Sequence, residues 1–105
     1  MARRAPTPAA LPRIGFIGLC VMGEPMATHL ARAGHALTLL DARAARTRTL
    51  ARRLGAHAAR TPREVGERSD LVVTMLPHGG VVQQVALGDD GLLHGMARGT
   101  LLVDT

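Results

Sequence analysis

The sequence predicts an α/β fold, a Rossmann-type doubly wound parallel sheet that is incomplete at its C-terminal end. Two observations predict it. Short apolar runs alternate with amphipathic stretches along the chain, which is the pattern of βαβ units. The run Leu71–Leu76 is apolar apart from Thr74 and does not alternate, as expected for a central strand covered on both faces. We assign residues 13–105 to this one domain and residues 1–12 to a disordered lead-in.

The first half of the chain is predicted to hold two strands, each followed by a helix. The strands cover Ile14–Gly18 and Ala36–Leu40, and the helices cover Met22–Ala33 and Ala44–Leu54. Gly34 and Gly55 suit the helix ends, because glycine adopts the left-handed conformation found there. The inner face of the first helix is expected to consist of Met22, Met26, Leu30 and Ala33, and that of the second of Leu50 and Leu54.

The second half is predicted to continue with a short strand over Ala56–Ala58 and a helix opened by Thr61-Pro62-Arg63-Glu64. That tetrapeptide reads as a capping box, in which Thr61 caps the helix and Glu64 reaches back three residues. After the strand Leu71–Leu76, the remaining predictions are a helix marked by Val81, Val82 and Val85, a turn over residues 88–91, and a last strand over Leu101–Val103.

Composition limits the classes of function. The net charge of +5 comes from arginine alone, because the chain has no lysine, and eight of its 13 arginines lie between Arg43 and Arg68. Phe16 is the single aromatic residue, so we expect a solvated helix face and no nucleic-acid partner. No apolar run approaches the roughly 18 residues of a membrane span. The five histidines lack metal-ligand spacing, so no metal site is expected. The lone Cys20 fits a reducing compartment, and we expect a cytoplasmic protein.

The most informative motif is the glycine turn between the first strand and the first helix. Its residues are Gly18, Leu19, Cys20, Val21, Met22 and Gly23. In a G-x-G-x-x-G pattern Gly18 permits the tight turn and Gly23 lets the helix pack close, so that free N–H groups at the helix N-terminus face a dinucleotide diphosphate. Cys20 occupies the middle position, where its side chain would crowd the diphosphate. We expect binding that is weakened about ten- to hundredfold but not abolished.

Asp41 and Arg43 give opposite indications about the nucleotide. Asp41 lies 23 residues after Gly18 at the end of the second strand, where an acid accepts hydrogen bonds from the adenosine ribose and repels a 2′-phosphate. Arg43 could instead neutralise that phosphate. Asp41 could also simply cap the following helix. We lean slightly to NAD over NADP.

The segment FIGLCVMGEPMATHLARAG resembles the signature of the β-hydroxyacid dehydrogenases, the group of 3-hydroxyisobutyrate and 6-phosphogluconate dehydrogenases. DLVVTMLPHGGVVQQVALGDDGLL and GTLLVDT extend the resemblance over nearly the whole chain after residue 12, and 2-hydroxy-3-oxopropionate reductases are the most similar members. The resemblance implies an N-terminal Rossmann domain that binds NAD(P). It also implies that Leu76 and Pro77 line the cofactor near its nicotinamide, and we add Val81 to this set.

The chain departs from the family pattern in three places. Cys20 replaces a glycine, and His29 replaces an asparagine. The family pattern continues with a substrate loop, a catalytic lysine and a helical domain, and this chain ends before them. We therefore expect hydride transfer to a small hydroxy acid in the complete architecture and no turnover from this chain alone. The alternatives are a non-catalytic nucleotide-binding or regulatory module, self-association through an exposed last strand, and nucleic-acid binding by the arginine face.

Overall fold

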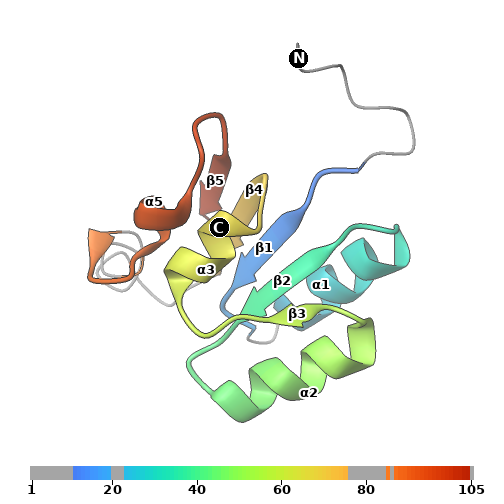
Figure 1. The fold of residues 1–105 in the computed structure, drawn as a ribbon. Coiled ribbons are helices and arrows are strands. Elements are labelled where there is room, and N and C mark those ends of the chain that lie inside the picture. Colours follow the sequence, from blue (N-terminus) through green and yellow to red (C-terminus); the bar gives the residue numbers. More distant parts are fainter. Residues whose placement is uncertain (1–10, 20–22, 76–84, 86, 105) are drawn as a thin grey trace.

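The computed structural model describes residues 11–19, 23–75, 85 and 87–104, and it contains a five-stranded parallel sheet in the order β3-β2-β1-β4-β5 (Figure 1). The strands are β1 (Ile14–Ile17), β2 (Leu37–Leu40), β3 (His57–Ala58), β4 (Leu71–Thr74) and β5 (Leu101–Asp104). The helices are α1 (Gly23–Arg32), α2 (Ala44–Leu54), α3 (Pro62–Glu67) and α5 (Leu92–Gly95). The predicted Rossmann-type parallel fold is confirmed.

The strand order reverses at β1, which pairs with β2 on one side and with β4 on the other. The register places Ile17 beside Leu40 of β2 and beside Thr74 of β4, so the three carboxyl ends lie at one edge of the sheet. In open α/β sheets, ligands bind outside the carboxyl ends of the strands at such a reversal. The topology therefore directs attention to the residues that follow β1, β2 and β4.

Two apolar clusters pack on the sheet, one on each face. Phe16 and Leu39 belong to the cluster that α1 and α2 cover with Ala27 and Leu50. Ile17 belongs to the other cluster, which α3 and α5 cover. Successive strand residues enter opposite clusters because side chains alternate across a strand. Both faces of β1 are therefore buried, and this explains its continuous apolar sequence.

The inner face of α1 differs from the predicted one by about one residue. Gly23 and Ala27 are its buried positions, and Leu30 and Ala31 pack partly against the first cluster. Met26 is instead 37% exposed. Small residues at the inner positions bring α1 close to the sheet, and a methionine there would hold it away. The prediction weighted hydrophobicity and overlooked this close packing.

The N-terminus of α3 carries a variant of the predicted capping box. The Thr61 hydroxyl accepts a hydrogen bond from the Glu64 N–H at 3.2 Å, as predicted. The Glu64 carboxylate, however, accepts from the N–H of Arg60 at 2.9 Å, four residues back instead of three. It also pairs with His57 of β3. The backbone hydrogen bond first, and the contact with His57 second, lower the pKa of Glu64.

Several strands and helices begin or end one or two residues from the predicted positions, whereas α2 has the predicted bounds. Gly18 falls outside β1, and β3 begins at His57 rather than Ala56. Of the predicted helix marked by Val81, Val82 and Val85, the first two residues lie outside the described residues, and Val85 is helical as predicted. The short helix α5, whose Leu92 is fully buried, was not predicted. No helix in the described part of the chain has the length and apolar character needed to cross a membrane.

Candidate functional site

The candidate site begins at the turn that follows β1. Gly18 has a φ of 95°, a conformation that residues with a side chain rarely adopt. Its N–H still donates to the Leu40 carbonyl at 2.9 Å, so the chain leaves the sheet immediately after this bond. Leu19 follows with its side chain fully buried in the first cluster. The turn is therefore fixed to the sheet on its inner side.

Gly23, the first residue of α1, lies directly against this turn. A Cβ at Gly23 would lie 2.5 Å from the Gly18 carbonyl oxygen, well inside van der Waals contact. Both partners are backbone, so neither can move away as a flexible side chain would. The absence of a side chain at this position lets the N-terminus of α1 approach the end of β1. The first N–H groups of a helix lack intrahelical partners and form a ready site for an anion.

Asp41 follows β2 and joins two backbone segments. One carboxylate oxygen accepts the Leu19 N–H at 2.7 Å, and the other accepts the Arg43 N–H at 3.0 Å. The Asp41 N–H in turn donates to the Thr47 hydroxyl at 2.8 Å. Arg43 is the N-cap residue of α2 and makes no side-chain capping bond. Asp41 thus lies two residues before the N-cap Arg43 and supports both the glycine turn and the start of α2. Each of its carboxylate oxygens can still accept a further hydrogen bond.

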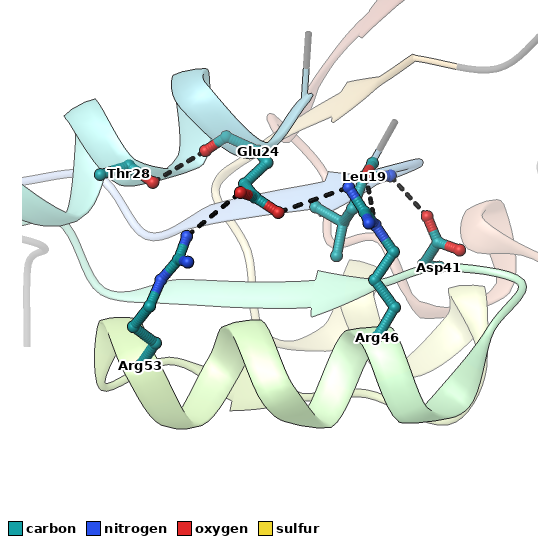
Figure 2. Close-up of polar contacts among 6 residues, drawn as sticks. All are labelled: Leu19, Glu24, Thr28, Asp41, Arg46 and Arg53. Carbon is teal, nitrogen blue, oxygen red and sulfur yellow. Dashed lines mark hydrogen bonds and ion pairs between the residues drawn. The ribbon is translucent and has the colours of Figure 1, made fainter. Parts of the chain in front are cut away.

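Arg46 of α2 contacts the other side of the same turn, as Figure 2 shows. Its Nε donates to the Leu19 carbonyl at 2.6 Å, and its Nη2 lies 3.4 Å from the carboxylate of Glu24 in the first turn of α1. Arg53, two turns further along α2, pairs with the other oxygen of Glu24 at 3.3 Å. Two arginines therefore offset the negative charge of Glu24 near the end of α1 that would face an anion.

The structure brings together Gly18, Leu19, Gly23 and Asp41, and it places the exposed Arg43 beside them. The other predicted site residues lie outside the described residues: Cys20, Val21, Met22, Leu76, Pro77 and Val81. The sequence interpretation missed Arg46, Thr47 and Glu24. One sequence signal could have indicated the contact with Glu24. Arg46 and Arg53 are seven residues apart, which places both on the same side of α2. Glu24 lies in the first turn of α1, where it could pair with them.

The residues present fit a dinucleotide. Gly23, the first residue of α1, lies so close to the Gly18 carbonyl that no residue with a side chain could replace it without displacing backbone. The N–H and the carbonyl of Leu19 are both engaged within the protein. The Leu19 N–H is therefore not free to donate to a diphosphate, and Leu19 supports the shape of the turn.

A parallel sheet that reverses at β1, a glycine turn from β1 into α1 and an acid after β2 define a Rossmann-type dinucleotide-binding domain. The chain belongs to the family of the NAD-binding domain of 6-phosphogluconate dehydrogenase, whose model matches residues 13–105. This match confirms the resemblance to the β-hydroxyacid dehydrogenases, and the chain is an NAD(P)-binding domain of that type of oxidoreductase.

Known proteins support the same assignment. The chain is 39% identical over 92 residues to the 2-hydroxy-3-oxopropionate reductase of Escherichia coli, and these residues are 88% of this chain and 31% of the relative. In structure it is similar to 3-hydroxyisobutyrate dehydrogenase of Mycobacterium tuberculosis, solved with L-serine, with a TM-score of 0.80 and 32% identity over 90% of this chain and 31% of that one.

An imine reductase from Myxococcus stipitatus is similar in two forms. A variant in complex with NAD+ gives a TM-score of 0.80 and 32% identity over 90% of this chain and 31% of that one. The form in complex with NADP+ gives a TM-score of 0.79 and 30% identity, over 89% of this chain and 31% of that one. The chain thus spans about a third of the length of the proteins it matches.

Proposed function

We propose that this chain binds NAD(P) with the diphosphate against the glycine turn, which Gly18 and Gly23 shape, and that amides after Leu19 donate to it. The close approach of Gly23 to the Gly18 carbonyl carries this proposal, because it brings the N-terminus of α1 to the end of β1. Leu19 supports the turn from the buried side. From the sequence pattern we extend the site to Cys20, Val21 and Met22 in the turn, and to Leu76, Pro77 and Val81 toward the nicotinamide.

For the nucleotide, we propose a modest preference for NAD. Asp41 places a carboxylate at the end of β2, and its remaining lone pairs can accept the ribose hydroxyls. A 2′-phosphate would meet this negative charge. Arg43 is exposed two residues further on and would offset part of the repulsion. We therefore expect both nucleotides to bind, with NAD+ binding a fewfold more tightly.

We further propose that the complete protein is an oxidoreductase that acts on a small hydroxy acid. A bound nicotinamide supplies hydride chemistry, and this chain contributes the binding and orientation of that cofactor. The names of two similar proteins, 2-hydroxy-3-oxopropionate reductase and 3-hydroxyisobutyrate dehydrogenase, support the substrate class. We propose a cytoplasmic location, which fits the single cysteine and which a fluorescent fusion can test.

Isothermal titration calorimetry of the purified 105-residue chain with NAD+ and NADP+ tests the proposal. We expect saturable binding of both, and tighter binding after Cys20→Gly, because the motif has a glycine at this middle position and a side chain there is expected to crowd the diphosphate. Asp41→Asn should raise the affinity for NADP+ relative to NAD+. Absence of heat from either nucleotide, in the wild type and in Cys20→Gly alike, would overturn the proposed function.

A further inference from the structure

We infer that Arg46 is a positioning residue for the cofactor, acting through the glycine turn. The inference rests on the proposed function and adds a residue that lies 27 positions away from the turn it supports. Arg46 belongs to the first turn of α2, and Leu19 follows β1. A single guanidinium therefore joins the strand-to-helix turn of the first βα unit to the first turn of the helix in the second.

The contacts of Arg46 complete a backbone clamp on Leu19. Asp41 accepts the Leu19 N–H at 2.7 Å, and Arg46 donates to the Leu19 carbonyl at 2.6 Å. Both backbone polar groups of Leu19 are thus held by side chains, one in each of the two peptides that flank this residue, and the Leu19 side chain is buried in the core. Because a peptide is planar, a hydrogen bond that holds the Leu19 carbonyl also restricts the peptide by which the chain leaves Leu19. We therefore expect Arg46 to restrict the backbone at the entry to the diphosphate-binding part of the turn.

The fork geometry of arginine is what permits this role. Nε points to the Leu19 carbonyl while Nη2 reaches Glu24, so one planar group contacts the end of β1 and the start of α1 together (Figure 2). A lysine ammonium at the same position could satisfy one of these partners at full strength but not both in this geometry. The two contacts fix the distance between the segments that bound the turn.

The same contacts argue against direct binding of a 2′-phosphate by Arg46. Its charge is already opposed by Glu24 at 3.4 Å, and its Nε is engaged by backbone. A residue that acts through the turn should affect NAD+ and NADP+ equally, because both carry the same diphosphate. A residue that binds the 2′-phosphate should affect NADP+ alone. This difference separates the two roles.

Arg53 provides a matched control. It comes from the same helix and pairs with the same carboxylate at 3.3 Å, but its side chain is 58% exposed and its ion pair is with Glu24 rather than with the turn. Arg46→Gln and Arg53→Gln therefore remove the same charge and one Glu24 contact each. They differ in the hydrogen bond to the Leu19 carbonyl.

The experiment combines calorimetry with amide hydrogen exchange in the full 105-residue chain. For Arg46→Gln we expect Kd to rise about tenfold for NAD+ and NADP+ alike, with faster exchange of the Leu19 amide. For Arg53→Gln, both Kd and the exchange rate of the Leu19 amide should stay within about twofold of the wild type. For Arg46→Lys, both values should lie between those of Arg46→Gln and the wild type. If Arg46→Gln does not fold, Arg46→Lys carries the comparison.

Two results would overturn the inference: unchanged exchange at Leu19 in Arg46→Gln, or a loss confined to NADP+. Failure of the wild type to bind either nucleotide would refute the proposed function instead. The exchange measurement would still decide whether Arg46 orders the turn.

Discussion

Substitution of Gly23 by alanine tests the geometry on which the proposed site depends. The added Cβ would lie 2.5 Å from the Gly18 carbonyl oxygen and 3.4 Å from its carbonyl carbon. Ordinary contact begins near 3.4 Å, so the turn or α1 must shift by nearly 1 Å. Gly18 cannot easily yield, because its φ of 95° and its bond to the Leu40 carbonyl fix it at the end of the sheet.

The expected cost follows from overpacking against rigid neighbours. Such strain typically costs about 1–3 kcal/mol, and about 2 kcal/mol in a domain of this size lowers Tm by roughly 10 °C. The same displacement moves the first amides of α1 away from the diphosphate, so we expect Kd for NAD+ to rise at least tenfold. Thermal unfolding followed by circular dichroism measures the first effect, and calorimetry measures the second.

Gly55→Ala is the matched control for this substitution. Gly55 caps α2 with a φ of 69°, but nothing lies within 4 Å of a Cβ built there. Alanine should therefore cost about 1 kcal/mol of backbone strain and leave cofactor affinity unchanged. The reasoning fails if folded Gly23→Ala binds NAD+ as tightly as Gly55→Ala does.

Three further substitutions address other parts of the fold. Asp41→Ala removes the acceptor for the Leu19 and Arg43 N–H groups and should lower the unfolding free energy by about 1–3 kcal/mol in urea titrations; an unchanged midpoint would contradict the bridging role. Glu64→Gln tests the lowered pKa of Glu64, which lies below the pKa of an unfolded glutamate. The ionised carboxylate therefore stabilises the fold fully above about pH 4.3, the unfolded pKa. This contribution is lost as the pH falls through the folded pKa. The two proteins should differ by about 1 kcal/mol at pH 7 in pH-dependent unfolding, and the difference should shrink as the pH falls through the folded pKa of Glu64. A constant difference would exclude the linkage. Leu102→Lys on the edge strand β5, where Leu101, Leu102 and Val103 are 65%, 38% and 41% exposed, should reduce any self-association seen by sedimentation velocity.

The sequence allowed prediction of the elements because local signals and burial agreed. Ala44–Leu54 was bounded correctly, since Leu50 marks the core side and Gly55 supplies the left-handed stop. The parallel sheet followed from non-alternating runs such as β4. In α1, Leu30 was placed correctly on the inner face and Met26 wrongly, because hydrophobicity alone cannot show that the helix packs closely through Gly23 and Ala27.

Site residues that belong to a motif of fixed spacing could be predicted from the sequence. Contacts that depend on how distant segments pack together could not. Gly18, Gly23 and Asp41 belong to a known spacing. The contact of Arg46 with Leu19 joins residues whose proximity depends on how two βα units pack, and nothing in their neighbours along the chain indicates it. The Glu64 carboxylate likewise accepts the Arg60 N–H and pairs with His57, whereas the capping box predicted a bond to the N–H of Thr61. The sequence could not show that β3 places His57 beside the N-terminal turn of α3.

The division of the interior into two clusters separated by the sheet has a consequence for how the domain tolerates change. The turn after β1 is braced by Leu19 in the cluster beneath α1 and α2. The cluster beneath α3 and α5 does not include Leu19, and within the described residues it approaches the turn through Ile17 of β1 and Leu40 of β2. Conservative repacking around Val65 and Leu92 should therefore alter thermal stability while sparing nucleotide affinity, whereas equally mild changes around Ala27 and Leu50 should alter both.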